Sequence, residues 1–452
     1  MNMRKLLDRL HAKLGDLWWY SLMIFLASRA ADALNVFVGL WLVPKYVGTE
    51  ELGAVMPLTN FAAALAMPIA VFAMVFMKEI NRLTTRKEFG QMKTLMRGVF
   101  IAAGIILLVA LILSKLILPV FLVRIRIAEG SLGLLILAAA FSASIAPVYT
   151  NALQALKKFK ALSILHVVGA PVRLLAMLVS MPFRALSGYF VGQCAPSLTG
   201  IVGSVVALRK ELSVPAQPYW SKQVFKRLSH HFAGTIAWGL SSNLCLVIES
   251  MILRQRLPDV DSAAYYLITR FSDIAAYLAV PLLTTLFPFT AELADSGKST
   301  RPLVFKCILA IATVNAILAL AFAFLGKPLL AMLPNGGSYA DFAWAIPWMI
   351  GITTLNFIVC FHTNTEISAG RFKFLRWWLP LSLGYPVLML LITGYGYFTA
   401  WLPECLCRFL LQNNITSLRS ILWWMTALAG LRTLFAGWEL LQQRNIPAPA
   451  VQ

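Results

Sequence analysis

The feature that most constrains the fold is a succession of long apolar runs, separated by short breaks rich in charged residues, proline or glycine. A membrane span requires about 20 apolar residues, and the chain of 452 residues contains twelve runs of that kind. Hydrophobic residues make up 59% of the chain and charged residues only 13%, which excludes an ordinary soluble domain. The sequence therefore predicts an all-α polytopic membrane protein of about twelve transmembrane helices. The approximate limits of the runs are 17–43, 52–77, 97–121, 131–155, 161–182, 186–208, 231–253, 263–290, 303–325, 340–363, 374–398 and 419–438.

An internal repeat divides these runs into two sets of six. Thr150-Asn151 recurs as Thr363-Asn364, and Phe159-Lys160 recurs as Phe372-Lys373, each after 213 residues. Because six is even, both halves enter the membrane from the same side, which predicts two lobes related by a parallel pseudo-two-fold axis. The expected parts are an N-terminal segment (1–16), an N-lobe (17–208), a linker (209–230), a C-lobe (231–438) and a tail (439–452).

The charge of the chain indicates its orientation. The 39 lysines and arginines exceed the 19 acidic residues and give a net charge of +20. Most of these basic residues fall in inner loops if both termini are cytoplasmic, as the positive-inside rule requires. They are spread over many short loops, a pattern that suits anionic lipid headgroups and argues against nucleic acid.

No motif in the chain indicates an enzyme, a metal or a cofactor. The six cysteines fall mostly inside apolar runs, where they are expected as small core residues. Gly297-Lys298-Ser299 is a fragment of a phosphate-binding loop, but Glu292 stands where that loop requires glycine. The nucleophile elbow Gly-x-Ser-x-Gly and the zinc motif His-Glu-x-x-His do not occur. We therefore expect a protein that is not an enzyme and holds no cofactor.

Two connecting segments resemble those of a known superfamily. They are Leu42–Gly53, with the sequence LVPKYVGTEELG, and Asn151–Lys160, with the sequence NALQALKKFK. Together with the two six-helix halves, they resemble the multidrug/oligosaccharidyl-lipid/polysaccharide (MOP) exporter superfamily, and most of all its O-antigen and polysaccharide flippases. The resemblance implies a transporter of the bacterial cytoplasmic (inner) membrane, built from two lobes around a central cavity and acting in polysaccharide, lipopolysaccharide or cell-envelope biosynthesis.

Charged residues inside the predicted spans are the candidates for a functional site. In the first span, Arg29, Asp32 and Asn35 follow one another at intervals of three and share one helix face. A charge at the centre of a membrane helix costs about 2.5 to 3.5 kcal/mol on insertion scales, so this face is expected to meet protein or water. The pair either lines a cavity or forms a structural ion pair.

Similar polar faces occur in other spans. In the run 161–182 one face carries His166 and Arg173, and in the run 263–290 one face carries Tyr266, Arg270, Asp273 and Tyr277. Arg173 either lines the cavity or extends to the interface, His166 either contacts a helix or carries a proton, and Arg270 and Asp273 either pair or act on substrate. Asn60 corresponds to Asp273 under the repeat, whereas Glu249 is expected in solvent near Arg254 or as an ion-coupling residue. Three tryptophan pairs are expected at the membrane interface, namely Trp18-Trp19, Trp377-Trp378 and Trp423-Trp424.

These faces support two transport hypotheses and one of another class. The first is a flippase for lipid-linked oligosaccharide, a polyprenyl-diphosphate sugar, whose phosphates arginines would bind by charge-assisted hydrogen bonds. Its substrate-binding candidates are Arg29, Arg173, Arg270, Asn35, Asn60, His166, Tyr266 and Tyr277, while Asp32, Asp273 and Glu249 are candidates for H+ or Na+ coupling. The alternative is a cation-coupled multidrug exporter of the MATE type, whose cavity would be rich in carboxylates and aromatics. The third hypothesis is a non-transporting scaffold for polysaccharide polymerase or glycosyltransferase partners.

Overall fold

The protein is an all-helical bundle in the part of the chain that the structure, a computed structural model, describes. Described are residues 26, 28–127, 132–156, 158–296, 298–392 and 417–442, which contain helices and connections but no strand. The first helix is described from residue 28 and passes through the π-helical segment η1 (Val38–Leu42) into α2 (Val43–Tyr46). The further helices are α3 (Thr49–Thr85), α4 (Phe89–Arg124), α5 (Leu132–Ala155), α6 (Phe159–Ser180), α7 (Ala185–Ala207), α8 (Arg209–Leu212), α9 (Lys222–Arg256), α10 (Asp259–Asp295), α11 (Arg301–Ala331), α12 (Ala345–Ser368), α13 (Leu375–Ile392) and α15 (Leu418–Gln442).

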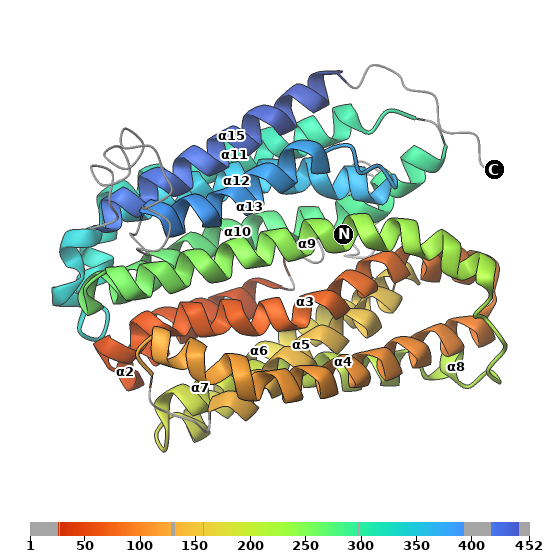
Figure 1. Cartoon of the computed structure of the whole chain (residues 1–452), viewed down its shortest axis with the longest axis horizontal. Helices are drawn as coiled ribbons and strands as arrows, with labels where there is room; N and C mark the ends of the chain where they lie inside the picture. Colours follow the sequence, from red (N-terminus) through yellow and green to blue (C-terminus); the bar gives the residue numbers. More distant parts are fainter. Residues whose placement is uncertain are drawn as a thin grey trace, which may run out of the picture.

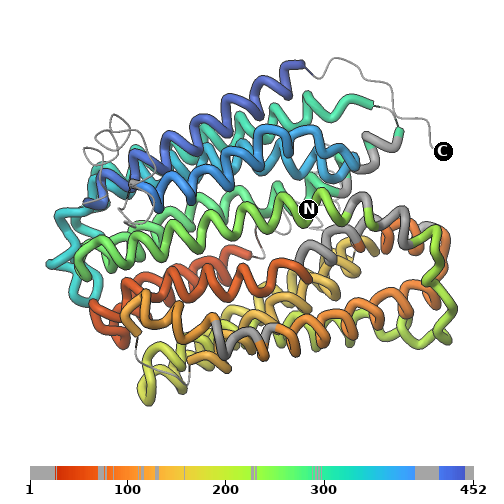
Figure 2. Tube along the Cα trace, in the orientation of Figure 1, coloured from red at the N-terminus to blue at the C-terminus, as the bar shows by residue number. Residues whose placement is uncertain are grey.

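The helices form two lobes that meet along long helices. Figure 1 shows α3 to α8 in its lower half and α9 to α15 in its upper half, and the colours of the trace divide in the same way (Figure 2). Helix α3 of the N-lobe packs against both α9 and α10 of the C-lobe. The two-lobed architecture expected from the sequence is therefore confirmed.

The internal repeat is visible in the helix boundaries. Helices α5 and α12 have 24 residues each, and α12 begins and ends 213 residues after α5. Helices α3 and α10 are likewise equal, with 37 residues each. Every span predicted from hydropathy contains a helix in the described residues. Because α5 and α12 keep the offset of 213 residues at both ends, the short sequence matches reflect a repeat of whole helices.

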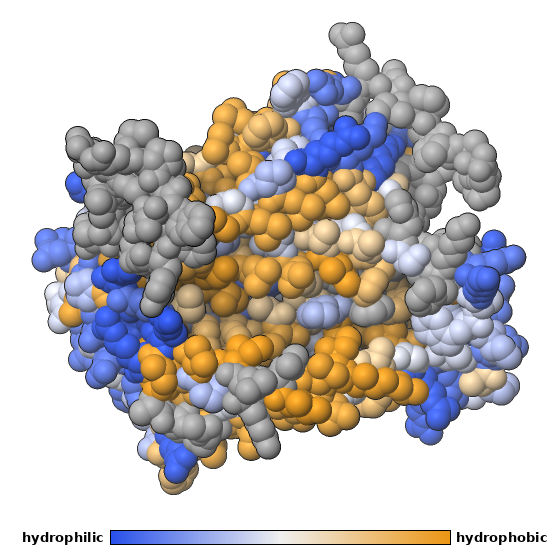
Figure 3. Space-filling model, in the orientation of Figure 1, coloured by the Kyte–Doolittle hydropathy of each residue, from blue (hydrophilic) through white to orange (hydrophobic). Residues whose placement is uncertain are grey.

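The outer surface of the bundle is that of a membrane protein. Nine helices in the described residues are long and apolar enough to cross a membrane, and α13 is a shorter apolar helix. Figure 3 shows a broad apolar belt over the middle of the molecule, with hydrophilic residues gathered at its two ends. Lipid-facing side chains such as Leu108, Val179 and Phe324 are more than half exposed. The chain is therefore a multi-pass membrane protein.

The predicted linker is shorter than hydropathy suggests. Of residues 209–230, the structure places 209–212 in α8 and residues 222–230 in α9. The hydroxyl of Ser221 accepts a hydrogen bond from the backbone N–H of Val224 at 3.2 Å and so caps the start of α9. Hydropathy detects only the lipid-buried part of a helix, whereas the cap shows where the helix itself begins.

Candidate functional site

The first helix carries its charged pair at the border between the lobes. Arg29 and Asp32 form an ion pair of 2.7 Å, as the spacing of three residues on one helix allows. The Arg29 guanidinium also donates a hydrogen bond of 2.8 Å to the backbone carbonyl of Tyr277 in α10. Arg29 is thus bound to both lobes, and the pair is placed where the two halves of the molecule meet.

Arg173 of α6 approaches the same helix from the other side. Its guanidinium donates a hydrogen bond of 2.9 Å to the side-chain oxygen of Asn35, while its buried Nε has no hydrogen-bond partner. Within the described residues, Arg173 belongs to no ion pair. It differs in this from Arg29 and Arg270, each of which has a carboxylate three residues away.

Arg270 crosses from α10 to the N-lobe. It forms an ion pair of 2.8 Å with Asp273, its guanidinium lies 5.3 Å from the centre of the Tyr266 ring, and it contacts the sulfur of Met56 in α3 at 3.1 Å. Its side chain passes so close to Gly39 that a Cβ there would lie 3.0 Å from the arginine Cδ. Gly39 lies in the π-helical segment η1, a type of distortion that is frequent at functional sites.

These residues form one group, here called the interlobe cluster: Arg29, Asp32, Asn35, Arg173, Arg270, Asp273 and Tyr277. Electrostatic interactions connect Arg173 to Asp273 and to Tyr277, and so link the two ends of the group. His166 of α6 interacts with Asp32, and the ring of Tyr266 underlies Arg270. The cluster contains three arginines and two aspartates, so positive charge is in excess at the lobe border.

Of the other predicted site residues, His166 and Tyr266 adjoin this cluster, whereas Asn60 and Glu249 lie apart from it. Asn60 of α3 donates hydrogen bonds to the Ser250 hydroxyl at 3.1 Å and to the Leu246 carbonyl at 3.3 Å, both in α9. It therefore connects the two lobes away from the arginines. Asp273, its counterpart in the repeat, belongs to the interlobe cluster instead.

Glu249 is also separate, and its expected position in solvent is wrong. Its side chain is buried in the C-lobe, where the Tyr265 hydroxyl donates a hydrogen bond of 3.4 Å to its carboxylate. Arg254, expected beside it at the surface, is fully buried and pairs with Asp259. The sequence placed Glu249 near a helix end, but α10 and α13 cover that end of α9.

The fold has known relatives, although the sequence alone finds none. No protein-family model and no curated protein matches the chain by sequence. A multidrug-resistance MATE-family transporter of the MOP superfamily, solved in an outward-facing conformation, superposes with a TM-score of 0.61 at 13% identity over 96% of this chain and 98% of its own. The MATE transporter VcmN of Vibrio cholerae in its bent form superposes with a TM-score of 0.59 at 15% identity over 96% and 98%. The chain has the MATE transporter fold.

Another structure with this fold has a binding pocket of reverse polarity. A MOP-superfamily transporter from Pyrococcus furiosus superposes with a TM-score of 0.61 at 12% identity over 94% of this chain and 96% of its own. The reverse polarity of the binding pocket of that protein suggests that its function is different. The expectation of a MOP-type architecture is thus confirmed for the fold, and the more specific resemblance to oligosaccharide flippases stays a prediction.

Within the MATE fold, sequence reasoning missed a second polar group in the C-lobe. Arg432 of α15 is buried and donates a hydrogen bond of 2.6 Å to the Ser382 hydroxyl. Its guanidinium stacks 4.5 Å from the centre of the Trp378 ring, and it interacts electrostatically with Glu249. The available signal was an arginine in the middle of an apolar run, the same signal that identified Arg29.

Trp377 and Trp378 were expected in the membrane interface, and this prediction is wrong. Both rings are buried in the C-lobe, at 9% and 5% exposure. Trp378 packs on Arg432 and donates a hydrogen bond of 3.1 Å to the Ser241 hydroxyl. Trp423 is 61% exposed, as an interfacial residue would be, while Trp18 and Trp19 lie outside the described residues. A buried cation offers an indole ring a partner that hydropathy does not detect.

Proposed function

We propose that this chain is a secondary transporter that moves its substrate across the membrane by alternating access of the two lobes. The observation that carries the proposal is the hydrogen bond from Arg29 of the N-lobe to the Tyr277 carbonyl of the C-lobe, within a cluster of five charged groups. Charges in a membrane bundle are costly, so their place at the lobe border favours a role in transport over a role in packing. The MATE fold supports the same conclusion.

Of the two substrate classes inferred from the sequence, the comparisons favour the MATE-type exporter of small molecules. In this proposal Asp32 and Asp273 are the residues that take up H+ or Na+. A cation bound at either carboxylate weakens its ion pair with Arg29 or Arg270. Arg29 also holds the Tyr277 carbonyl, and Arg270 also contacts Met56, so both arginines touch the opposite lobe. A change at either ion pair therefore acts directly on the contacts between the lobes.

One observation favours the second class, an anionic substrate such as a lipid-linked oligosaccharide. Arg173 forms no ion pair within the described residues, and its Nε is buried without a hydrogen-bond partner. A planar guanidinium with unused donors suits bidentate binding of a phosphate or carboxylate. In this variant of the proposal Arg173 binds the anion, and Asn35 holds the guanidinium in position through their bond of 2.9 Å.

The test is transport in proteoliposomes with two substrates. Under the first proposal, the wild-type protein exports an ethidium-like organic cation in exchange for H+ or Na+ that moves down its own gradient. Under the second, it accelerates translocation of a polyprenyl-diphosphate sugar. If neither substrate moves faster than in empty vesicles, the chain is not a transporter of these classes.

The variant Arg173→Gln distinguishes the two proposals further. It removes one charge and keeps hydrogen-bonding capacity, so we expect transport of an anionic substrate to fall about tenfold or more, while export of an organic cation is kept or increased. Arg376→Gln is the matched control, since Arg376 is an exposed arginine on α13 away from the cluster. Equal effects of the two substitutions on both substrates would contradict a specific role for Arg173.

A further inference from the structure

The two lobes are joined at one end of the molecule by a group of charged and backbone contacts, separate from the interlobe cluster. It lies where α3 begins and α9 ends. Here Arg126, just after α4 of the N-lobe, donates a hydrogen bond of 3.0 Å to the Gln255 carbonyl of the C-lobe. Arg254 of the C-lobe donates in return to the Ile125 carbonyl of the N-lobe at 3.3 Å. The two bonds run in opposite directions across the lobe border.

Asp259 connects the two arginines. Its carboxylate pairs with Arg254 at 2.5 Å and with Arg126 at 3.5 Å. Arg254 is fully buried, whereas Arg126 and Asp259 have side chains that are 49% and 41% exposed. One carboxylate at the first residue of α10 thus holds a fixed arginine of its own lobe and a solvent-accessible arginine of the other lobe.

The backbone at Arg126 adopts a conformation in which glycine would be more favourable. Its φ is 61°, in the left-handed region, and the backbone N–H groups of Arg126 and Ile127 close the end of α4 on Val123 and Leu122. Glycine is the usual residue at this position of a helix end, because it adopts a positive φ without steric cost. Arginine makes this turn less favourable than glycine would, but its side chain forms the hydrogen bond to the C-lobe.

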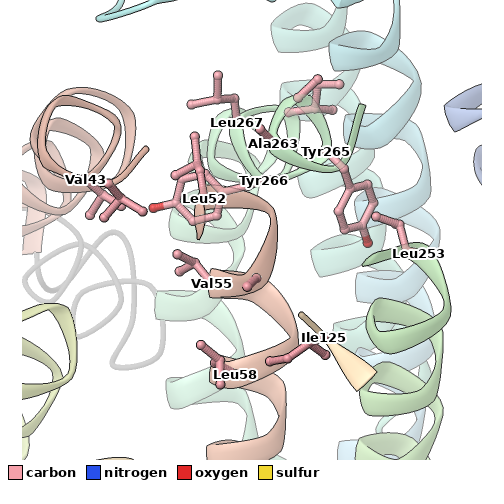
Figure 4. Close-up of a cluster of buried hydrophobic side chains, with 14 of the residues drawn as sticks. Val43, Leu52, Val55, Leu58, Ile125, Leu253, Ala263, Tyr265, Tyr266 and Leu267 are labelled. Carbon is pink, nitrogen blue, oxygen red and sulfur yellow. The ribbon is translucent and has the colours of Figure 1, made fainter. Parts of the chain in front are cut away.

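An apolar seal adjoins these charges, since it includes Ile125, whose carbonyl accepts the hydrogen bond from Arg254. Leu52, Val55 and Leu58 of α3 belong to the same apolar cluster as Leu253 of α9 and Tyr266 of α10, and all five are at most 2% exposed (Figure 4). Gly53 of α3 approaches Ser262 of α10 so closely that a Cβ would lie 2.5 Å from its hydroxyl. The two helices can touch at this point only because residue 53 has no side chain.

We propose that Arg126, Arg254, Gln255, Asp259 and the carbonyl of Ile125 form a latch that keeps this end of the transporter closed. The inference rests on the proposed function, since it identifies the gate of an alternating-access cycle. Opening breaks the bonds of Arg126 to Gln255 and Asp259 and the bond of Arg254 to Ile125. The pair of Arg254 and Asp259 stays intact within the C-lobe, so the buried arginine is never left without its carboxylate. This end is the outer one if the termini are cytoplasmic.

The experiment measures the distance between the lobes at this end by double electron–electron resonance. Spin labels are placed at Gly48→Cys, before α3, and Val260→Cys, in α10, in a protein whose native cysteines are replaced by serine or alanine. Both sites are suitable, since a side chain at position 48 meets nothing within 4 Å and Val260 is 39% exposed. The protein is held in lipid nanodiscs without substrate.

Arg126→Gly removes the latch side chain and at the same time relieves the backbone, so it does not endanger folding. We expect it to raise the ratio of long to short distances about three- to tenfold, the effect of losing one charge-assisted hydrogen bond and a half-exposed ion pair. Lys87→Gly is the matched control: Lys87 also has a left-handed backbone, with φ 59°, at the end of α3, and its side chain is exposed. It is expected to leave the distances unchanged.

A second pair of variants tests the close packing of α3 against α10, at a point where a Cβ at position 53 would also lie 3.2 Å from the Arg254 guanidinium. Gly53→Ala inserts a methyl group against Ser262 and is expected to raise the same ratio, whereas Gly104→Ala, which meets nothing within 4 Å, leaves it unchanged. The latch is refuted if Arg126→Gly and Lys87→Gly give the same distance distribution as wild type. The distances require no substrate. Absence of transport together with a working latch would thus overturn the proposed function alone.

Discussion

Individual arginines inside this bundle differ in how their charge is balanced. Arg29 and Arg270 have aspartates one helical turn away, Arg254 has Asp259, and Arg432 has an aromatic ring, a hydroxyl and the more distant Glu249. Breaking a buried pair by removing one partner is costly, because the remaining charge stays buried without compensation. Arg173, by contrast, belongs to no ion pair within the described residues.

Arg432→Met tests the structural case. The substitution removes the hydrogen bond to Ser382, the stacking on Trp378 and the positive charge near the buried Glu249, so we expect a loss of stability of about 1 to 3 kcal/mol. The measurement is thermal unfolding of the purified protein in a fixed detergent, compared with wild type. In the double variant Arg432→Met with Glu249→Gln part of the loss should be recovered, since residue 249 then carries no charge. Additive losses in that double variant would show that the two groups do not interact.

The segment that connects the two lobes, residues 213–221, is hydrogen-bonded to the first turns of α4. The backbone N–H of Gln217 donates to the Gly90 carbonyl at 3.2 Å, the Thr94 hydroxyl donates to the Gln217 carbonyl at 2.7 Å, and Lys93 donates to the Val214 carbonyl at 3.2 Å. These contacts attach the connection, residues 213–221, to the N-lobe. In the proposed cycle, relative motion of the lobes is expected at the start of α9, which Ser221 caps.

Helix α8, which leads into this connection, is held by an ion pair of 2.7 Å between Lys158 and Glu211. Burial disfavours the ionised form of Glu211, but the hydrogen bond and charge of Lys158 outweigh it and lower the pKa of the carboxyl below its ordinary value of 4.5. The pair therefore fastens the helix that leads into the segment bound by α4.

Gly90→Ala tests whether this attachment holds. A Cβ at position 90 would lie 2.6 Å from the carbonyl oxygen of Pro215, a backbone atom that cannot rotate away. We expect the connection to detach from α4, so that trypsin cleaves after Lys222 at least about threefold faster than in wild type. Gly104→Ala on the same helix is the control, since it meets nothing within 4 Å. Unchanged cleavage of Gly90→Ala would contradict a tightly bound connection.

At the scale of the whole molecule, the repeat determines which ends of the helices share a side of the membrane. With six spans in each lobe, as the sequence predicts, the N-terminus, the connection 213–221 and the C-terminus are expected on one side. The basic residues of the inner loops favour the cytoplasm for that side. The latch then lies on the opposite side, where α3 begins.

This orientation is open to a direct test with reporter fusions in a bacterial host. We expect green fluorescent protein to fluoresce when fused after residue 442, and alkaline phosphatase to be inactive there. In the connection between α11 and α12, near Asn335, an inserted phosphatase should be active. The reverse pattern at both sites would show that the molecule has the opposite orientation, with the latch on the cytoplasmic side.

The sequence alone determined the class of the protein, its spans and its repeat, because lipid imposes the same apolar length on every helix. It also determined which residues are candidates, since a charge such as Arg29 or Asp32 stands out in an apolar run. Only the tertiary structure decided which of these charges meet. Arg173 reaches Asn35 across 138 residues of chain and Arg29 reaches Tyr277 across 248, whereas Glu249 joins a separate group with Tyr265. The physical reason is that hydropathy depends on the contact of each helix with lipid, while the partner of a buried charge depends on which helices pack together.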